Sequence, residues 1–346
     1  MVRRSQGRVF RDGIFRNCLP ASLLLTLVFL IAVAAPAQTC YTSEDIDPAT
    51  HTALWNTAKH YFDMVSKGDC PTLRQNAIAG LAADFSGVEN AVKDNQENFS
   101  GTSATPRQPY LLKAEGTTPL PKAEFLCGVF GPNGQTANSA EFVIPNLQPG
   151  NYAIAILDVS TAKGPFTVSF VLQQQGNDWK LGGFYVKDAQ IAGHDGNWFA
   201  DKARTLKGKG QTHNAWLYFL EARELMVPLP FMYTQATDKL YDESDNVKPS
   251  DLPVGGNAVD LAAGGKTYKL TAVFPMPLGK DFDLVVKYQV ADVSNTAQTF
   301  QENSAVMRAL VAKFPELRDA FDGMVARAVE PSGKDYGSLL PMKDIK

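Results

Sequence analysis

The residue types that could bind a metal are few in this chain, and their spacing argues against a metal site. The sequence has four histidines, His51, His60, His194 and His213. None of them forms an H-x-x-x-H pair. If His51 and His60 share a helix, they lie about 13 Å apart along it, too far for joint ligation of one zinc ion. We therefore expect no bound metal.

A short segment, Gly264-Gly265-Lys266-Thr267, is similar to part of a phosphate-binding loop. That loop requires a further glycine five positions before Gly265, where this chain has Asp260. A strand rather than a helix is expected to follow, so no helix N-terminus is placed to bind phosphate. We interpret the segment as a turn and expect no cofactor.

The cysteines predict at most one internal disulfide. Cys18 lies in the N-terminal segment described next, which leaves Cys40, Cys70 and Cys127 in the remaining chain. These three are too scattered for a zinc site. The sequence leaves open which two of them pair, although a long helix between Cys40 and Cys70 weighs slightly against that pair.

Residues 1–37 have the three parts of a cleavable export signal. Five arginines and a single acid come first, an apolar run follows, and Ala35-Pro36-Ala37 ends the segment with the small-x-small pattern of a cleavage site. The run from Leu23 to Ala35 is shorter than the ~20 residues that span a bilayer. We expect cleavage after Ala37, export to the periplasm or the medium, and no transmembrane helix in the mature chain. The alternative is an uncleaved N-terminal anchor.

The charge of the mature chain argues against nucleic-acid binding. Removal of 1–37 takes away five of the 33 basic and one of the 36 acidic residues, which leaves 28 against 35 and a net charge near −7. A nucleic-acid binder needs a basic face. The one basic run, from Lys202 to Lys209, is interpreted as the solvated end of a helix.

The pattern of residues 44–190 changes from helical to extended. Asp47-Pro48 marks a helix start, and Lys67-Gly68-Asp69 marks its end. After a loop at 96–107, apolar residues alternate with polar ones, as in strands. The expected elements are helices at 48–66, 71–81 and around 88–92, and strands at 108–115, 123–130, 141–145, 152–159, 166–173 and 179–186, the last three of which form an antiparallel meander.

The second half of the chain divides into three further parts. Residues 194–245 have helical spacing, with a third helix expected at 231–241. Residues 246–265 are rich in proline and glycine and are interpreted as a linker. The C-terminal unit, 266–346, has a β-hairpin at 268–290 followed by two helices at 303–314 and 315–329, and the tail 336–346 lacks periodicity.

The first half resembles the NTF2-like (cystatin-like α+β) superfamily over about residues 44–190. The resemblance rests on the order of elements, on the Ser66–Asp69 connection, and on the final strand. That strand places Trp179, Leu181, Phe184 and Val186 in the Trp-x-Leu-x-x-Phe-x-Val pattern frequent in the superfamily. The resemblance implies a curved antiparallel sheet wrapped around an N-terminal helix. The alternative is a β-sandwich for 108–190, favoured by the segment 144–152.

The NTF2-like resemblance implies a pocket but does not fix a reaction. An isomerase-type site in that pocket would need an acid beside a tyrosine. Asp158 with Tyr152 or Tyr185 are the candidates on the expected strands, although Asp158 is also placed where turn acids are common.

A second resemblance concerns residues 198–228, whose small and aromatic residues have the spacing of one tetratricopeptide-type helical hairpin. No second copy follows, and such repeats need about three copies to form a continuous core. The aromatic residues of this region, among them Trp198, Trp216, Phe219 and Tyr233, either form a core or line a ligand or partner surface.

Taken together, these patterns predict an exported α+β protein. We expect a non-enzymatic envelope or extracellular protein that binds a partner protein or a small apolar ligand. The alternative is a small-molecule enzyme of the isomerase or dehydratase kind that uses an NTF2-like pocket.

Overall fold

The computed structural model describes residues 38–129 and 134–346. Helices and sheets contribute in similar measure, so the α+β class expected from the sequence is confirmed. The expected export signal, 1–37, lies outside the described residues. Within them, no helix combines the length and the apolar character needed to cross a bilayer.

The helices that precede the first large sheet begin where the sequence places capping residues. The Asp47 side chain accepts hydrogen bonds from the backbone N–H groups of Ala49 and Thr50, and Pro48 occupies the first turn. Gly68 ends that helix in the left-handed conformation, with φ 70°. The helices are α1 (Pro48–Lys67), α2 (Cys70–Gln75), α3 (Ala79–Ala83) and α4 (Ser86–Phe99).

The first large sheet is antiparallel throughout, and it contains the expected meander of its last three strands. Its strand order is β1-β3-β6-β7-β8, and β2 also pairs with β6. The strands are β1 (Gln38–Tyr41), β2 (Ala104–Pro106), β3 (Tyr110–Ala114), β6 (Gly150–Thr161), β7 (Gly164–Gln175) and β8 (Asp178–Asp188).

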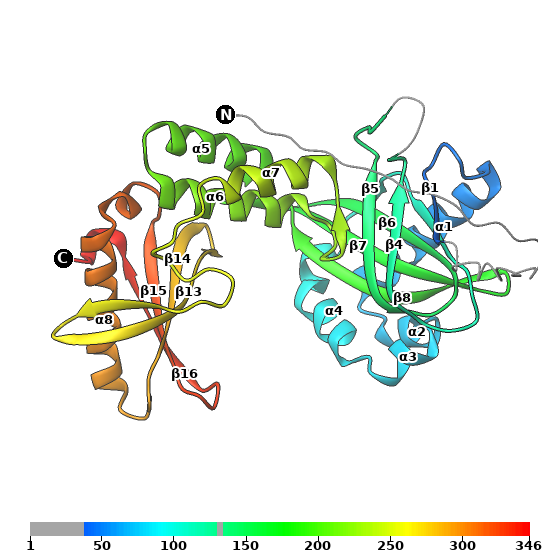
Figure 1. The fold of residues 1–346 in the computed structure, drawn as a ribbon. Coiled ribbons are helices and arrows are strands. Elements are labelled where there is room, and N and C mark those ends of the chain that lie inside the picture. The colour runs from blue at the N-terminus through cyan, green and yellow to red at the C-terminus, as the bar shows by residue number, and fades with distance from the viewer. Residues whose placement is uncertain (1–37, 130–133) are drawn as a thin grey trace, which may run out of the picture. The chain divides into compact units, whose positions relative to one another are not determined.

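The two faces of this sheet carry separate cores because successive residues of a strand point to opposite faces. On one face, Ala155 and Leu157 of β6 belong to a core with Phe62 of α1 and Phe99 of α4. Figure 1 shows the helices along that side of the sheet. On the other face, Ile154 and its neighbours pack on a smaller sheet of β4 (Leu120–Cys127), β5 (Ala140–Leu147) and β11 (Met232–Tyr233).

One disulfide joins these two sheets. Cys40 of β1 is bonded to Cys127 of β4, and the bond closes a segment of 87 residues. Cys70 is the free cysteine of the described chain and is half-buried. The pairing that the sequence left open is therefore Cys40–Cys127.

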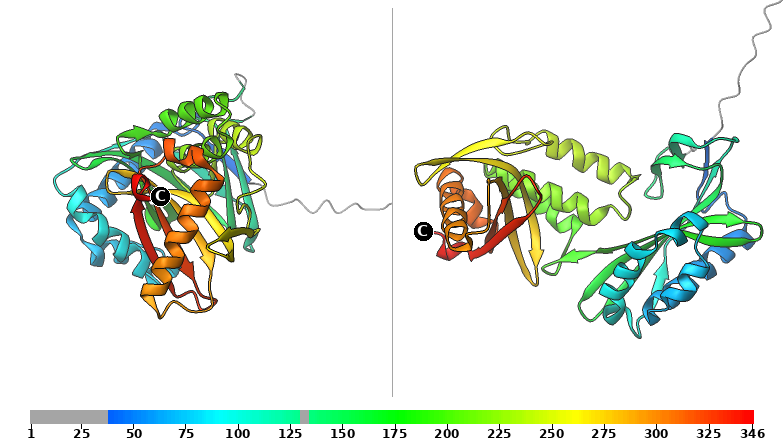
Figure 2. Two further views of the ribbon diagram at one scale, coloured as in Figure 1. Left: turned by 90° about the vertical axis from the view of Figure 1, so that its left-hand side faces the viewer. Right: turned by 90° about the horizontal axis from the view of Figure 1, so that it is seen from below.

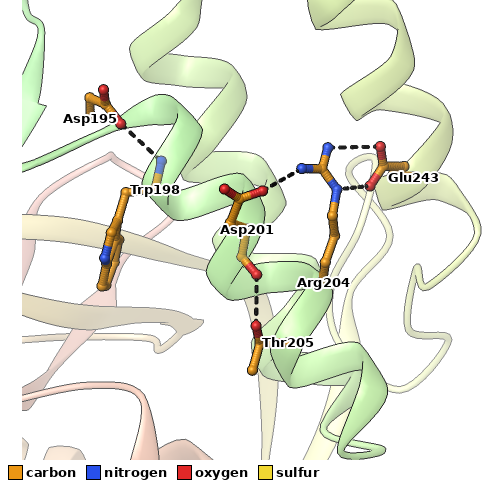
Figure 3. A network of polar contacts seen from close by, with 6 residues as sticks. All are labelled: Asp195, Trp198, Asp201, Arg204, Thr205 and Glu243. Carbon is orange, nitrogen blue, oxygen red and sulfur yellow. Dashed lines mark hydrogen bonds and ion pairs between the residues drawn. The ribbon is translucent and has the colours of Figure 1, made fainter.

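The middle of the chain forms a helical layer after two short strands, β9 (Gln190–Ile191) and β10 (His194–Asp195). Its helices are α5 (Gly196–Gly208), α6 (Thr212–Met226) and α7 (Gln235–Asp245). Helix α5 begins against α6 at Gly196, where a Cβ atom would lie 2.9 Å from the carbonyl oxygen of Ala222. Figure 3 shows how α7 is fixed to α5: the Arg204 guanidinium donates to both carboxylate oxygens of Glu243, at 2.7 and 2.9 Å, and to Asp201.

The C-terminal sheet has five strands in the order β12-β13-β14-β15-β16. All neighbouring pairs are antiparallel except β14 and β15, which are parallel and are connected through α8 (Thr296–Lys313). Helix α8 packs against this sheet (Figure 2). The strands are β12 (Val259–Ala263), β13 (Lys266–Leu278), β14 (Asp281–Gln289), β15 (Gly323–Val329) and β16 (Asp335–Pro341), and two 3-10 turns, η1 (Pro315–Asp319) and η2 (Met342–Asp344), flank the last two strands.

The structure corrects four expectations for this half. The helix expected at 315–329 is wrong, because 315–319 forms η1 and 323–329 forms the buried strand β15. The linker at 246–265 contains β12, and the tail contains β16. The third helix begins at Gln235 rather than at 231, since Thr234 caps it and Met232-Tyr233 pairs with β5. One hydrophobic core includes residues of α5, α6 and α7 and of the C-terminal sheet.

Candidate functional site

A cleft of about 830 Å³ lies beside helix α6. Its walls are mainly apolar, and a few polar side chains converge on it, which is the usual composition of small-molecule sites. The apolar lining residues are Val186, Leu220, Val227, Pro230, Met232, Phe274 and Pro275, and the polar ones are Lys187, Glu221, Arg223, Glu224, Tyr233 and Thr237.

Helix α6 explains why an acid is buried in this cleft. Most of the helix is covered on every side, including Trp216 and Phe219, as expected for an apolar helix inside a protein. Glu221 shares this environment and has only 5% of its surface exposed. Its neighbours one turn away on the helix are Leu217 and Leu225, so its side chain extends from a largely apolar stripe.

The Glu221 carboxyl makes no hydrogen bond within the described chain, although the residue as a whole is largely buried. Its oxygens are not among the fully enclosed side-chain atoms that lack a partner, so solvent in the cleft can reach them. Burial and, to a smaller extent, the nearby Glu224 carboxylate raise the pKa of Glu221 to about 7, against the opposing effect of Lys187. At neutral pH the group therefore exchanges between a carboxylic acid and a carboxylate.

Lys187 connects β8 to the C-terminal end of α6 and does not pair with Glu221. It extends from β8, and its ammonium donates to the carbonyl oxygens of Glu224 at 2.7 Å and Val227 at 3.1 Å. These are acceptors at the C-terminal end of α6, where a cation is favourable. The same ammonium lies 2.6 Å from the Glu224 carboxylate. The Lys187 ammonium therefore already has three acceptors, two carbonyl oxygens and one carboxylate oxygen.

Arg223, which also lines the cleft, contacts an aromatic ring of α7. Its guanidinium lies 4.8 Å from the ring centroid of Tyr241 on α7, in cation–π geometry. Its Nε atom is buried without an acceptor among the described residues. Helix α7, which supplies Thr237 to the cleft, is held by the Arg204–Glu243 ion pair drawn in Figure 3.

The structure does not assemble the acid and tyrosine site that the NTF2-like resemblance implied. Asp158 is exposed over 54% of its side chain and forms a two-pronged ion pair with Arg107, with N–O distances of 2.7 and 3.1 Å. Asp158 is therefore a surface acid paired with arginine and is not enclosed in a pocket beside a tyrosine. Its position near the end of β6 leaves the carboxylate in solvent, where arginine is the available partner.

The two tyrosines proposed beside Asp158 are core residues. Tyr152 donates to the carbonyl oxygen of Gln148 at 2.8 Å, and the Tyr185 ring packs edge-on against Phe231. Both belong to the core between the two N-terminal sheets, where burial raises the pKa of each phenol. Within the described chain, neither tyrosine hydroxyl forms a hydrogen bond with a carboxylate.

Of the four aromatic residues singled out from the sequence, two are buried in the core and two are partly exposed. Trp216 and Phe219 are 5% and 0% exposed and belong to the core, so they cannot contact a ligand or partner directly. Tyr233 is 38% exposed and lines the cleft. Trp198 is half-exposed, stacks on His194 at 3.6 Å between ring centroids, and lines a separate cavity of about 310 Å³.

Glu221 itself was missed by the sequence reasoning. The helical spacing of residues 194–245 predicts a helix here but does not single out Glu221 as a buried residue. The available signal was its position between Leu217 and Leu225, four residues away on each side.

No group of three or more histidine, cysteine or acidic side chains within 38–129 and 134–346 is arranged to hold a metal ion. No protein-family model matches the chain, and no curated protein or solved structure is significantly similar to it. The function must therefore be argued from the cleft.

Proposed function

We propose that this chain is an exported, non-enzymatic protein that binds a small, largely apolar ligand in the cleft beside α6. The observation that carries the proposal is the combination of a mainly apolar cleft of about 830 Å³ with a largely buried acid in its lining, Glu221, whose carboxyl has no hydrogen-bond partner among the described residues. A buried carboxyl without a partner is costly, and a bound ligand can supply the missing hydrogen bond.

Export is supported by two independent features of the chain. The segment 1–37 has the charge, apolar run and small residues of a cleavable signal. The Cys40–Cys127 disulfide is of a kind that persists mainly in oxidising compartments.

The NTF2-like assignment of residues 44–190 is part of the proposal, in a scaffolding role. It is supported by the antiparallel meander with α1 and α4 along one face. The space between the helices and that face is filled by aromatic side chains, among them Phe62, Phe99 and Phe170. We therefore place the ligand at α6 and not under these helices.

Native mass spectrometry tests the binding function. The mature chain from Gln38 is recovered from an exported fraction and compared with Leu220→Trp and Val227→Phe, two variants that fill the cleft. We expect a co-purifying small-molecule mass on the wild type that both variants lose. The matched control is Leu339→Trp on the exposed face of β16, which should keep that mass. Equal occupancy of all four proteins would place the ligand elsewhere, and bare protein in every case would contradict the proposal.

A second candidate function, an isomerase- or dehydratase-like enzyme, is favoured by one observation. A buried carboxyl with a pKa of about 7 is matched to general acid–base chemistry at neutral pH. The recovered ligand distinguishes the two functions. Catalysis predicts that the wild type converts it into a product of different retention time and that Glu221→Gln does not, whereas a binding protein returns it unchanged.

A further inference from the structure

We infer that the contact between His213 and Asp251 is a pH-sensitive switch. It ties the segment 246–258 to helix α6 while the imidazole is protonated, and it breaks when the imidazole becomes neutral. The inference goes beyond the ligand binding proposed above and does not depend on it. It follows from the two carboxylates that face the ring and from the number of protons that two hydrogen bonds need.

The imidazole of His213 lies between two carboxylates. Its Nδ1 atom is 2.7 Å from Glu316 Oε1 of η1, and its Nε2 atom is 3.0 Å from Asp251 Oδ1. The ring packs against Phe314 at 4.2 Å between centroids, and the side chain is only 16% exposed. One side chain near the start of α6 therefore connects this helix to two segments that are 38 and 103 residues away in the chain.

A neutral imidazole cannot make both of these hydrogen bonds. Aspartate and glutamate are ordinarily ionised at neutral pH, and an ionised carboxylate only accepts hydrogen bonds. Each contact therefore needs a proton on the ring nitrogen that faces it. A neutral imidazole has one N–H group and an imidazolium has two, so both contacts form together only while His213 is protonated. Histidine is the side chain whose charge ordinarily changes near neutral pH.

The Asp251 contact is the one that should break. It is the longer of the two, and the Asp251 side chain is 44% exposed, so its carboxylate can turn into water. The Glu316 side chain is 22% exposed, and the backbone carbonyl oxygen of Glu316 also accepts from Asn214 Nδ2 at 2.6 Å. We therefore expect the neutral ring to keep its proton on Nδ1, toward Glu316. The lone pair on Nε2 then faces Asp251 and repels its carboxylate.

The other charged side chains of the elements around the ring have contacts of their own. These elements are the segment 246–258, the end of α8, and η1. Within the described chain, none of their other charged groups hydrogen-bonds to the imidazole. They are Lys248 with Asp245 at 3.6 Å, Lys313 over the Phe314 ring, Arg318 with the carbonyl oxygens of Met342 and Ile345, and Asp319 with Gln211 at 2.9 Å.

Loss of the Asp251 contact should loosen the segment without unfolding it. Leu252 is 2% exposed and Val247 is 8% exposed, and both belong to the hydrophobic core of this half. The segment follows α7, the helix that lines the cleft with Thr237. The switch therefore controls the polar attachment of the chain at the end of α7.

Nuclear magnetic resonance of the isotope-labelled mature chain detects the protons on each ring nitrogen. We expect His213 to carry protons on both Nδ1 and Nε2 at pH 5 and on Nδ1 alone at pH 9. The internal controls are His51, His60 and His194, which form no ion pair within the described chain. A His213 ring that stays doubly protonated at pH 9, or that keeps its last proton on Nε2, would overturn the inference.

Asp251→Asn provides the energetic test, because it removes the charge at nearly constant size. At pH 5 its equilibrium constant for unfolding should be about fivefold larger than that of the wild type, because a charge-assisted hydrogen bond is weakened. At pH 9 the difference should be less than about twofold, since the wild type has already lost the contact. Urea denaturation measures both, and Asp94→Asn, on the exposed side of α4, should match the wild type at each pH. An equal effect of Asp251→Asn at the two pH values would contradict the switch.

Discussion

Lys187 and Glu224 are joined twice, since the Lys187 ammonium lies 2.6 Å from a carboxylate oxygen of Glu224 and 2.7 Å from the backbone carbonyl oxygen of the same residue. The second contact is the more informative one. It places the ammonium group of a residue on β8 at the C-terminal end of α6, where the last carbonyl groups have no partner within the helix. A single side chain of β8 therefore fixes the end of the helix that carries Glu221.

Replacement of Lys187 by methionine should destabilise the protein by roughly 1–3 kcal/mol, because two carbonyl oxygens lose their donor while the aliphatic packing is kept. It should also raise the pKa of Glu221 further, since Lys187 lowers that pKa in the wild type. Urea denaturation measures the first effect. Lys163→Met, in an exposed turn, is the matched control, and equal losses in the two variants would contradict the capping role.

The buried carboxyl of Glu221 makes stability depend on pH. Its ordinary pKa of 4.5 is raised to about 7 by folding, so the folded chain holds this proton more tightly than the unfolded chain. The free energy of unfolding that this group contributes is fully present below pH 4.5 and is lost as the pH rises through 7. The loss between pH 5 and pH 8 should be about 2–3 kcal/mol.

Glu221→Gln isolates this effect, because the amide does not titrate. Between pH 5 and pH 8 the wild type should lose about 2–3 kcal/mol of unfolding free energy that Glu221→Gln keeps. Relative to the wild type, the variant should therefore become more stable by that amount. Urea titrations at both pH values measure it, with Glu97→Gln as the control that should track the wild type. A constant difference across the pH range would show that Glu221 keeps an ordinary pKa.

The disulfide should contribute strongly to stability because it closes a long segment. For the 87 residues between Cys40 and Cys127, the chain-entropy argument gives roughly 4–5 kcal/mol. We expect a large fall in Tm on addition of reductant to the wild type and to Cys70→Ala, and none for the double variant Cys40→Ala/Cys127→Ala. A reductant effect that disappears in Cys70→Ala would instead assign that thiol to the bond.

Local signals in the sequence predicted those elements that are bounded by caps or in which apolar and polar residues alternate. Asp47, Pro48 and Gly68 delimit α1, and the alternation along 166–173 marks β7, one of the strands of the meander. Both signals depend on neighbouring residues in the chain, so no tertiary information is needed.

The sequence-based predictions of secondary structure were wrong where tertiary packing determines the structure. Leu317, Phe321 and Met324 have helical spacing, yet 323–329 becomes the strand β15 between β14 and β16. Strand β15 is a largely buried, mostly apolar run without a clear period of two, and such a run cannot be distinguished from a buried helix by pattern alone. The exposure of Asp158 and the burial of Glu221 were not predictable for a related reason, since both depend on which segments pack around them.

A buried polar network in the C-terminal sheet offers a further test of the fold. The Tyr288 hydroxyl donates to Asn303 Oδ1 at 2.8 Å, and Asn303 Nδ2 donates to the Ser338 hydroxyl at 2.8 Å. Tyr288 and Asn303 are fully buried, and these contacts join β14, α8 and β16. Tyr288→Phe keeps the ring but leaves Asn303 Oδ1 without its donor, so it should cost about 1–3 kcal/mol.

The neighbouring Tyr268 provides the matched control for this substitution. It is also buried, its ring packs edge-on against that of Tyr288 at 5.2 Å between centroids, and its hydroxyl makes no hydrogen bond within the described chain. Tyr268→Phe should therefore change the unfolding free energy by less than about 0.5 kcal/mol. Thermal or urea denaturation compares the two variants. Similar small effects would mean that Asn303 finds another donor, whereas a large effect confined to Tyr288→Phe supports the pairing of α8 with this sheet through Asn303.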